Sequence, residues 1–190
     1  RTGSEIRSLA LSWDESVLYA ALSDSKEVIT LDAENCKVIS RLRISGEPWA
    51  VLPSPDAENL FVADFDGNRI LRINIKNGKV KNTSPTIARP SCLTFAPEGD
   101  SIYTIGFRTG EITQLDLECQ ILRRIPALNQ LNQCRSLTVG PEGTIYAPQT
   151  RSDTVVGGRM FDRSVFPVVA AVAPAAEQVS LVFFPDLLVV

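Results

Sequence analysis

The chain has 190 residues, of which 44% are hydrophobic and 22% are charged, and its formal net charge is -3. This composition is typical of a globular domain and excludes a disordered chain, which would combine low hydrophobicity with high charge. The slight acidic excess argues against nucleic acid as a partner, because phosphate-binding surfaces are basic. Histidine is absent, so the commonest general base and the commonest zinc ligand are missing from any mechanism within these residues.

In chain order, residues 6–46 contain four short apolar runs separated by turn clusters. The runs are LALSW (9–13), LYAAL (18–22), VITLD (28–32) and KVISRLRI (37–44). Their lengths and their content of β-branched, aliphatic and aromatic residues predict β-strands. No convincing helical period is found anywhere in the chain. The segment therefore predicts a sheet of four short strands.

The same arrangement recurs along the rest of the chain. An aromatic residue follows an aliphatic one at intervals of 42, 42 and 43 residues, at Tyr19, Phe61, Tyr103 and Tyr146. An acidic turn residue precedes each of them, and the series continues once more: Asp14, Asp56, Glu98, Glu142 and Asp186. Five residues before each acidic residue lies an aliphatic one, at Leu9, Val51, Leu93, Leu137 and Leu181. These series in register indicate an internal repeat.

A repeat of about 42 residues with four strands per unit is typical of a β-propeller. We expect an all-β fold of four-stranded antiparallel blades, with about four blades and the start of a fifth, as part of a propeller of six to eight blades. The expected blades cover residues 6–46, 47–88, 89–132 and 133–177, with a partial blade at 178–190, in one domain of residues 1–190. We expect the repeated aromatic residues to lie in the core between blades. The apolar segment FPVVAAVAP (166–174) is expected to form the last strand of the fourth blade.

The apolar segment from Phe166 to Val190 is interrupted by proline and charged residues such as Pro167 and Glu177, so no run of about 18 apolar residues exists there. No membrane-spanning helix is therefore expected. The opening residues, RTGSE, lack the positive and apolar parts of a signal peptide. The compartment stays open on this basis.

The four cysteines include no C-x-x-C pair, so a structural zinc site is not expected. They are Cys36, Cys92, Cys119 and Cys134. We interpret them as small apolar residues with free thiols, and disulfide pairing is the alternative.

Two stretches resemble the YVTN-type propeller repeat: SPDAENLFVADFDGNRILRINIKNGKV (54–80) and the preceding LSWDESVLYAALSDSKEVITLDAENCKVIS (11–40). The segment VADFDGNRI (62–70) is also similar to the NHL repeat, and WD repeats are more distantly similar. The resemblance implies a binding propeller, or an enzyme such as a lactonase-like hydrolase or a lyase. Such enzymes use histidine or a metal in the central channel, so this chemistry would have to come from blades outside this chain. The resemblance slightly favours an extracytoplasmic location.

In propellers resembling this one, the loops before the inner strands and those between the second and third strands commonly face one rim. The candidate binding residues there are Trp49, Arg89, Arg108, Arg135 and Arg151. The arginines are interpreted either as a site for an anion or carboxylate, which guanidinium groups bind in a bidentate manner, or as solvated surface. Trp49 is interpreted either as an exposed anchor for a partner or as a residue buried between blades.

Asp64, Asp66 and Asn68 have a D-x-D-x-N spacing that offers oxygen ligands to calcium. The same spacing is also that of an ordinary turn, because aspartate and asparagine bond to the local backbone. Calcium is the only candidate cofactor, and no other cofactor is expected. No catalytic residue is assigned, because no G-x-S-x-G motif and no glycine-rich phosphate loop is present.

The first interpretation of function is a non-enzymatic binding propeller that presents a rim surface to a protein or a small ligand. One alternative is a lactonase- or lyase-like enzyme whose active site is completed by blades outside this chain. A second alternative is a structural repeat module of a larger surface or scaffold protein. An open arc of blades leaves apolar faces and strand edges uncovered, so self-association through these edges is also expected.

Overall fold

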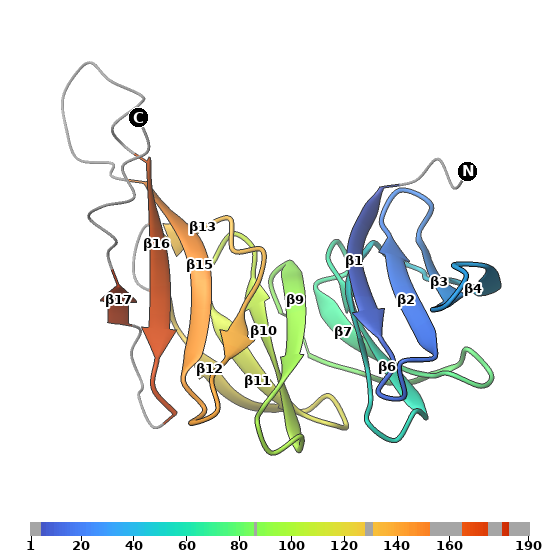
Figure 1. The fold of residues 1–190 in the computed structure, drawn as a ribbon. Helices are drawn as coiled ribbons and strands as arrows, with labels where there is room; N and C mark the ends of the chain where they lie inside the picture. The colour runs from blue at the N-terminus through green and yellow to red at the C-terminus, as the bar shows by residue number, and fades with distance from the viewer. Residues whose placement is uncertain (1–4, 86, 128–130, 153–164, 175–179, 183–190) are drawn as a thin grey trace.

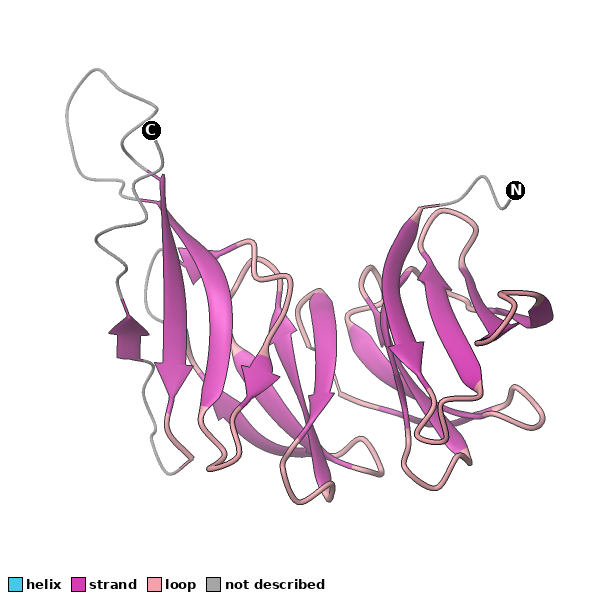
Figure 2. Cartoon of the chain, viewed as in Figure 1, coloured by secondary structure: helices cyan, strands magenta, loops and turns pink. Residues whose placement is uncertain are grey.

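The computed structural model describes residues 5–85, 87–127, 131–152, 165–174 and 180–182, and all regular structure in these residues is β-strand (Figures 1 and 2). The strands form four sheets that follow one another along the chain. Figure 1 shows these sheets arranged side by side in an arc. Among the described residues there is no helix that is long and apolar enough to cross a membrane.

The first three sheets each contain four consecutive antiparallel strands. The first sheet consists of β1 (Ile6–Leu11), β2 (Val17–Leu22), β3 (Glu27–Asp32) and β4 (Val38–Arg43). The second consists of β5 (Pro48–Pro53), β6 (Asn59–Asp64), β7 (Arg69–Asn74) and β8 (Val80–Thr83). The third consists of β9 (Pro90–Phe95), β10 (Ser101–Gly106), β11 (Ile112–Asp116) and β12 (Ile121–Ile125). Each strand pairs with the next one through a short turn, as expected for antiparallel blades.

The fourth sheet is less regular. Its strands are β13 (Leu131–Asn132), β14 (Thr138–Val139), β15 (Ile145–Ser152), β16 (Val165–Val172) and β17 (Ser180–Val182). β13 and β14 both pair with β15, and β16 pairs with β15 on one edge and with β17 on the other. The expectation that residues 166–174 form the last strand is therefore wrong. β16 is hydrogen-bonded on both edges, and its Ala170 and Val172 are buried in the cluster shared with the third sheet.

Two short strands fall across the expected blade limits. Leu131–Asn132, expected at the end of the third blade, pair with β15 of the fourth sheet. Ser180–Val182, in the segment expected to begin a fifth blade, pair with β16. The short connection after β16 favours the pairing of Ser180–Val182 with that strand. Leu131–Asn132 instead pair with β15, although β12 is nearer in the chain. Residues 153–164 and 183–190 lie outside the described part of the chain.

The turn that contains the repeated acidic residue has a similar conformation in every sheet. The residue that follows the acidic turn residue has a positive φ in each case, at Glu15, Ala57, Gly99 and Gly143. In the first sheet, Asp14 accepts hydrogen bonds from the hydroxyl groups of Ser12 and Ser16, which lower the pKa of the Asp14 carboxyl group. Asp56 closes the turn of the second sheet in the same way, because its carboxylate accepts a hydrogen bond from the amide of Glu58.

Adjacent sheets are held together by apolar clusters between their facing surfaces. Each cluster contains the repeated aromatic residue of one sheet and the repeated aliphatic residue of the next. The pairs are Tyr19 with Val51, Phe61 with Leu93, and Tyr103 with Leu137. The aromatic residue of a sheet therefore faces forward along the arc, and the aliphatic residue faces backward.

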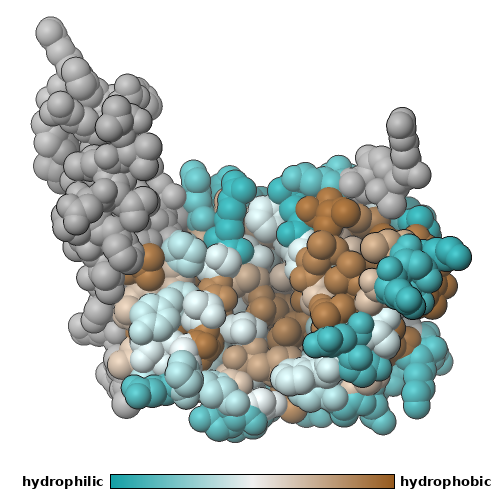
Figure 3. Space-filling view, viewed as in Figure 1, coloured by the Kyte–Doolittle hydropathy of each residue, from teal (hydrophilic) through white to brown (hydrophobic). Residues whose placement is uncertain are grey.

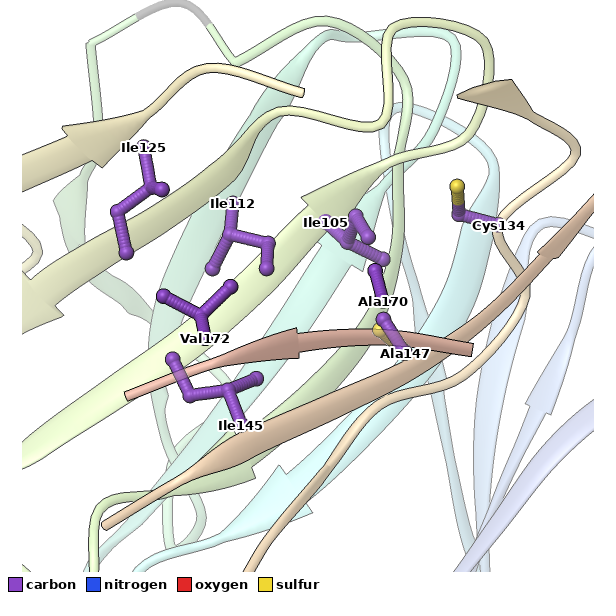
Figure 4. Packing of buried hydrophobic residues seen from close by; sticks show 9 residues of the cluster. Ile105, Ile112, Ile125, Cys134, Ile145, Ala147, Ala170 and Val172 are labelled. Carbon is purple, nitrogen blue, oxygen red and sulfur yellow. The ribbon is translucent and has the colours of Figure 1, made fainter. Parts of the chain in front are cut away.

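Figure 4 shows the interface between the third and fourth sheets at close range. Ile112 and Ile125 of the third sheet lie in one buried cluster with Ile145 and Val172 of the fourth. Burial of an aliphatic side chain of this size contributes about 1.5–3 kcal/mol, so these contacts are the main stabilisation between the sheets.

Tyr146 departs from the aromatic series. Tyr19 and Phe61 are 5% and 1% exposed, whereas Tyr146 is 41% exposed, so the prediction that Tyr146 lies in the core is wrong. A forward-facing residue is covered only by a following sheet, and no described sheet follows the fourth. The first sheet shows the converse, because the backward-facing Leu9 is 56% exposed. Figure 3 shows hydrophobic surface over this sheet.

Four antiparallel sheets, stacked face to face through repeated contacts, identify the fold as that of a β-propeller. This confirms the all-β propeller class expected from the 42-residue repeat. The stacking also determines where a functional site can lie, because it brings the first strands of all four sheets to one side of the arc.

Candidate ligand site at the channel mouth

The first strands of the sheets lie next to one another around the inside of the arc (Figure 1). β1 contacts β5, β5 contacts β9, and β9 contacts β14. Two overlapping pockets of about 250 and 290 Å³ lie along this wall. Both are lined by Arg7, Trp49, Ser91 and Arg135. The first three lie in β1, β5 and β9, and Arg135 lies between β13 and β14 of the fourth sheet. We call this region the channel mouth.

Three aromatic rings are clustered at the channel mouth. Trp49 stacks on Phe65, with the ring centroids 3.6 Å apart and the ring planes 9° apart. Phe107 packs against both rings at steep angles, with centroid distances of 5.3 Å to Trp49 and 5.6 Å to Phe65. The indole Nε1 of Trp49 donates a hydrogen bond of 2.8 Å to the carboxylate of Glu47. Trp49 is therefore half-buried and held on one ring face and at its polar edge.

A guanidinium group lies against each ring. The distance from the guanidinium carbon to the ring centroid is 4.6 Å for Arg7 and Trp49, 5.2 Å for Arg89 and Phe65, and 5.9 Å for Arg135 and Phe107. A cation within about 6 Å of an aromatic ring is attracted to the negative face of the ring. In every pair, the arginine belongs to a different sheet from the ring. The contacts therefore link all four sheets and place three positive charges at one rim.

These positive charges are only partly neutralised. Arg7 forms an ion pair of 2.8 Å with Glu5, and its Nε donates to the hydroxyl oxygen of Ser23 at 3.3 Å. Neither Arg89 nor Arg135 forms an ion pair with a described residue. The channel mouth thus carries exposed positive charge on a chain whose net charge is -3.

Asp64, the first residue of the candidate calcium site, is fully buried and accepts three hydrogen bonds. Its Oδ1 accepts from the amides of Glu47 at 2.9 Å and Gly67 at 3.0 Å, and its Oδ2 accepts from Nε of Arg69 at 2.9 Å. A Cβ atom at Gly46 or Gly67 would lie 1.8 or 2.0 Å from these oxygens. Asp64 therefore ties the loop before β5 to the turn after β6.

The other two candidate calcium ligands also serve the turn. Asn68 has a φ of 54°, and its side-chain amide donates to the carbonyl oxygen of Asp66 at 3.1 Å. Its Oδ1 accepts a hydrogen bond of 3.0 Å from the amide of Arg89, so the turn supports an arginine of the channel mouth. In the described part of the chain, no group of three or more Asp, Glu, Cys or His side chains is arranged to hold a metal ion. Calcium binding here stays a prediction from the sequence, and the three hydrogen bonds that Asp64 already accepts argue against this residue as a ligand.

Three of the five candidate binding residues meet at the channel mouth: Trp49, Arg89 and Arg135. Arg108 is exposed in the turn between β10 and β11, next to Phe107 in the sequence. Arg151 lies in β15, and its side chain is outside the described part of the structure.

Arg7, Phe65 and Phe107 also belong to the site and were not recognised from the sequence. Their signal is the repeat itself. Arg7 and Trp49 each lie two positions before the repeated aliphatic residue, and Phe65 and Phe107 each lie four positions after the repeated aromatic residue. An alignment of the four units would have placed Arg7 at the position equivalent to Trp49, and Phe65 and Phe107 at equivalent positions of neighbouring units.

The cysteines are free thiols, as interpreted from the sequence. Cys92, Cys119 and Cys134 are buried, and burial raises the pKa of each thiol to about 12. Because the thiolate is the nucleophilic form, these three residues stay protonated and unreactive at neutral pH. Cys36 is exposed in the turn between β3 and β4.

No family model and no curated protein matches this chain. Among solved structures, the fold is similar to that of Kuenenia stuttgartiensis hydrazine synthase, with a TM-score of 0.66 and 13% sequence identity. The similarity covers 95% of this chain and 66% of that chain, so this chain spans just under two thirds of its length. At this level of identity the similarity shows the fold alone.

Proposed function

We propose that this chain is a non-enzymatic binding module of the β-propeller type, with its ligand site at the channel mouth. The observation that carries the proposal is a pocket that residues from all four sheets line, among them Arg7, Trp49 and Arg135. Each of these three residues is held in a cation–π contact. Tryptophan and arginine are the residues most enriched among those that dominate binding energy. Their fixed orientation lowers the entropy that binding would otherwise cost.

A small ligand suits this site better than a protein partner. The pockets have volumes of about 250 and 290 Å³, just below the usual range for small-molecule sites, so they would hold only a small ligand. As part of the same proposal, this chain belongs to the YVTN or NHL group of propellers. This assignment rests on the repeats at 11–40 and 54–80.

A structural module of a larger assembly is the second candidate function. It is favoured by the exposure of Leu9 and Tyr146, which occupy positions that are covered by a neighbouring sheet elsewhere in the arc. Such a module would bind further sheets through its end faces and need no ligand at the channel mouth.

Fluorescence of Trp49 tests the binding function directly. The chain has two tryptophans, so the Trp13→Phe variant leaves Trp49 as the single indole. Titration of this variant with neutral, cationic and anionic small molecules is expected to give a saturable change for at least one class. If every class leaves the emission unchanged, the site binds no small ligand and the structural module is favoured.

Calorimetry with divalent metals separates this proposal from the enzyme alternative. Tight binding of calcium or zinc by the unmodified chain would favour metal-dependent chemistry of the lactonase type. We expect no binding heat that depends on Asp64, because its carboxylate oxygens accept hydrogen bonds from two amides and from Arg69. An Asp64→Asn variant is the matched control for this measurement.

A further inference from the structure

We propose that the channel mouth binds a small anion, whose carboxylate or phosphate oxygens are held by Arg7 and Arg135. The inference rests on the proposed binding function and names its ligand class. Both guanidinium groups line the pocket of about 250 Å³, together with Glu5, Trp49 and Ser91. Arg7 belongs to the first sheet and Arg135 lies between β13 and β14 of the fourth, so the two charges reach the pocket from the two ends of the arc.

The pocket already shows that a carboxylate fits beside Arg7. The carboxylate of Glu5 lies 2.8 Å from Nη1 of Arg7, and both side chains are partly exposed. An exposed ion pair of this kind is weak, because water screens it and both side chains lose freedom in forming it. A ligand carboxylate or phosphate can therefore replace Glu5 on Arg7 and contact Arg135 at the same time.

Both arginines are oriented before a ligand arrives. Arg7 lies over Trp49 at 4.6 Å and donates to Ser23, and Arg135 lies over Phe107 at 5.9 Å. Contact with a ring face leaves the N–H groups at the guanidinium edge available for bidentate pairing with an anion. A guanidinium that is already oriented loses less side-chain entropy on binding, which favours the complex.

The remaining polar groups of the pocket also point to an anion. The single hydroxyl proton of Ser91 is directed at the carbonyl oxygens of Ile105 and Cys134, so among the side chains of the pocket the arginines are the main donors left for a ligand. Arg135 forms no ion pair with a described residue. A neutral or cationic ligand would remove water from two guanidinium groups without replacing it by negative charge, which is unfavourable.

The test is titration of the Trp13→Phe variant with sodium succinate and, separately, with inorganic phosphate at constant ionic strength. We expect a saturable change in Trp49 emission for at least one of the two, and the tighter one identifies the carboxylate or the phosphate as the preferred group. Arg135→Gln should weaken binding by about tenfold or more, since hydrogen bonds to charged groups are among the strongest. Glu5→Gln should tighten binding about two- to fivefold, because it removes the competing carboxylate.

Arg43→Gln, on the outermost strand of the first sheet, is the matched control and should leave the affinity unchanged. Arg7→Gln is the second variant, and circular dichroism shows whether it remains folded. Equal affinities for the unmodified, Arg135→Gln and Arg43→Gln proteins would overturn the anion site. If neutral or cationic molecules alter Trp49 emission and both anions do not, the ligand class is wrong but the binding function stands. If no small molecule alters it, both proposals fail.

Discussion

The interfaces inside the arc and the two faces at its ends are made from the same repeated positions, yet their environments are opposite. Phe61 is 1% exposed between the second and third sheets, whereas Tyr146, at the equivalent position of the fourth sheet, is 41% exposed. Val51 is buried, whereas its equivalent Leu9 is 56% exposed. The repeat position determines the direction in which a side chain points, and the neighbouring sheet determines how much that side chain contributes to stability.

The largest expected difference between the two regions comes from removing the aromatic side chain. Phe61→Ala should lower the free energy of unfolding by about 3–5 kcal/mol, because it leaves a cavity in a packed interface. Tyr146→Ala should lower it by less than about 1 kcal/mol, since part of the ring is already in water. Urea denaturation of both variants checks this, and equal losses would contradict the comparison.

Two glycines in turns of the second and fourth sheets give the next largest difference in stability. A Cβ at Gly67 would lie 2.0 Å from the buried carboxylate of Asp64, so Gly67→Ala should cost about 1–3 kcal/mol through overpacking. The nearest atoms to a Cβ at Gly140, in the turn after β14, are 3.6 Å away, so Gly140→Ala should have a much smaller effect. Thermal and urea unfolding of the two variants measure the difference, and a larger loss for Gly140→Ala would reverse the interpretation.

Alkaline pH should weaken the interfaces that contain buried thiols. Cys92 and Cys134 lie between the third and fourth sheets and Cys119 between the second and third, each with a pKa raised to about 12 by burial. An unfolded thiol ionises near pH 8.5, so above that pH the unfolded state releases protons that the folded state keeps. The stability is therefore fully present below about pH 8.5 and falls, by about 1.4 kcal/mol per pH unit for each thiol, up to about pH 12.

Urea midpoints at pH 8, 9 and 10 in the presence of a reducing agent measure this slope. Cys92→Ala should reduce the slope, whereas Cys36→Ala should not, because Cys36 is exposed. A slope that is unchanged in Cys92→Ala would show that the buried thiol does not cause the alkaline destabilisation.

The smallest expected effect concerns the end faces themselves. Leu9 and Tyr146 are the aliphatic and aromatic partners of an interface that the arc repeats three times, so we expect two copies of the chain to associate weakly through these faces. The double variant Leu9→Asp, Tyr146→Asp should shift the average mass from light scattering toward the monomer. Val80→Asp, at an exposed aliphatic residue of β8, is the control and should leave the mass unchanged. A monodisperse monomer for the unmodified chain would refute the expectation.

The regular part of the fold was predictable because the turns and strands of each unit are determined by its local sequence. Asp14 and Asp56 close local turns, and short antiparallel hairpins require contacts only between neighbours in the chain. The fourth sheet was harder to predict, because β15 and β16 are joined by a longer connection and β16 is apolar enough to suit more than one position. Its order depends on pairing partners that the local sequence does not specify.

The candidate site was predictable only in part, for a related reason. Trp49, Arg89 and Arg135 were recognised by residue type and by their place before an inner strand. Arg7 was missed because its contact with Trp49 joins residues in different sheets. The D-x-D-x-N spacing suggested ligands, yet two amides and an arginine donate to the buried carboxylate of Asp64, and hydrogen bonds between distant residues are not visible in a spacing.

The sequence alone therefore determined the blade architecture, because a repeat of hydrophobic and turn residues is local and each unit must bury its faces against another unit. The tertiary structure decided which aromatic residues are buried, which strand borders the fourth sheet and which guanidinium groups meet at the channel mouth. These features depend on which sheets lie next to one another in space. The burial and the charge environment of a side chain depend on the neighbouring sheet, and they cannot be derived from the position of the residue along the chain.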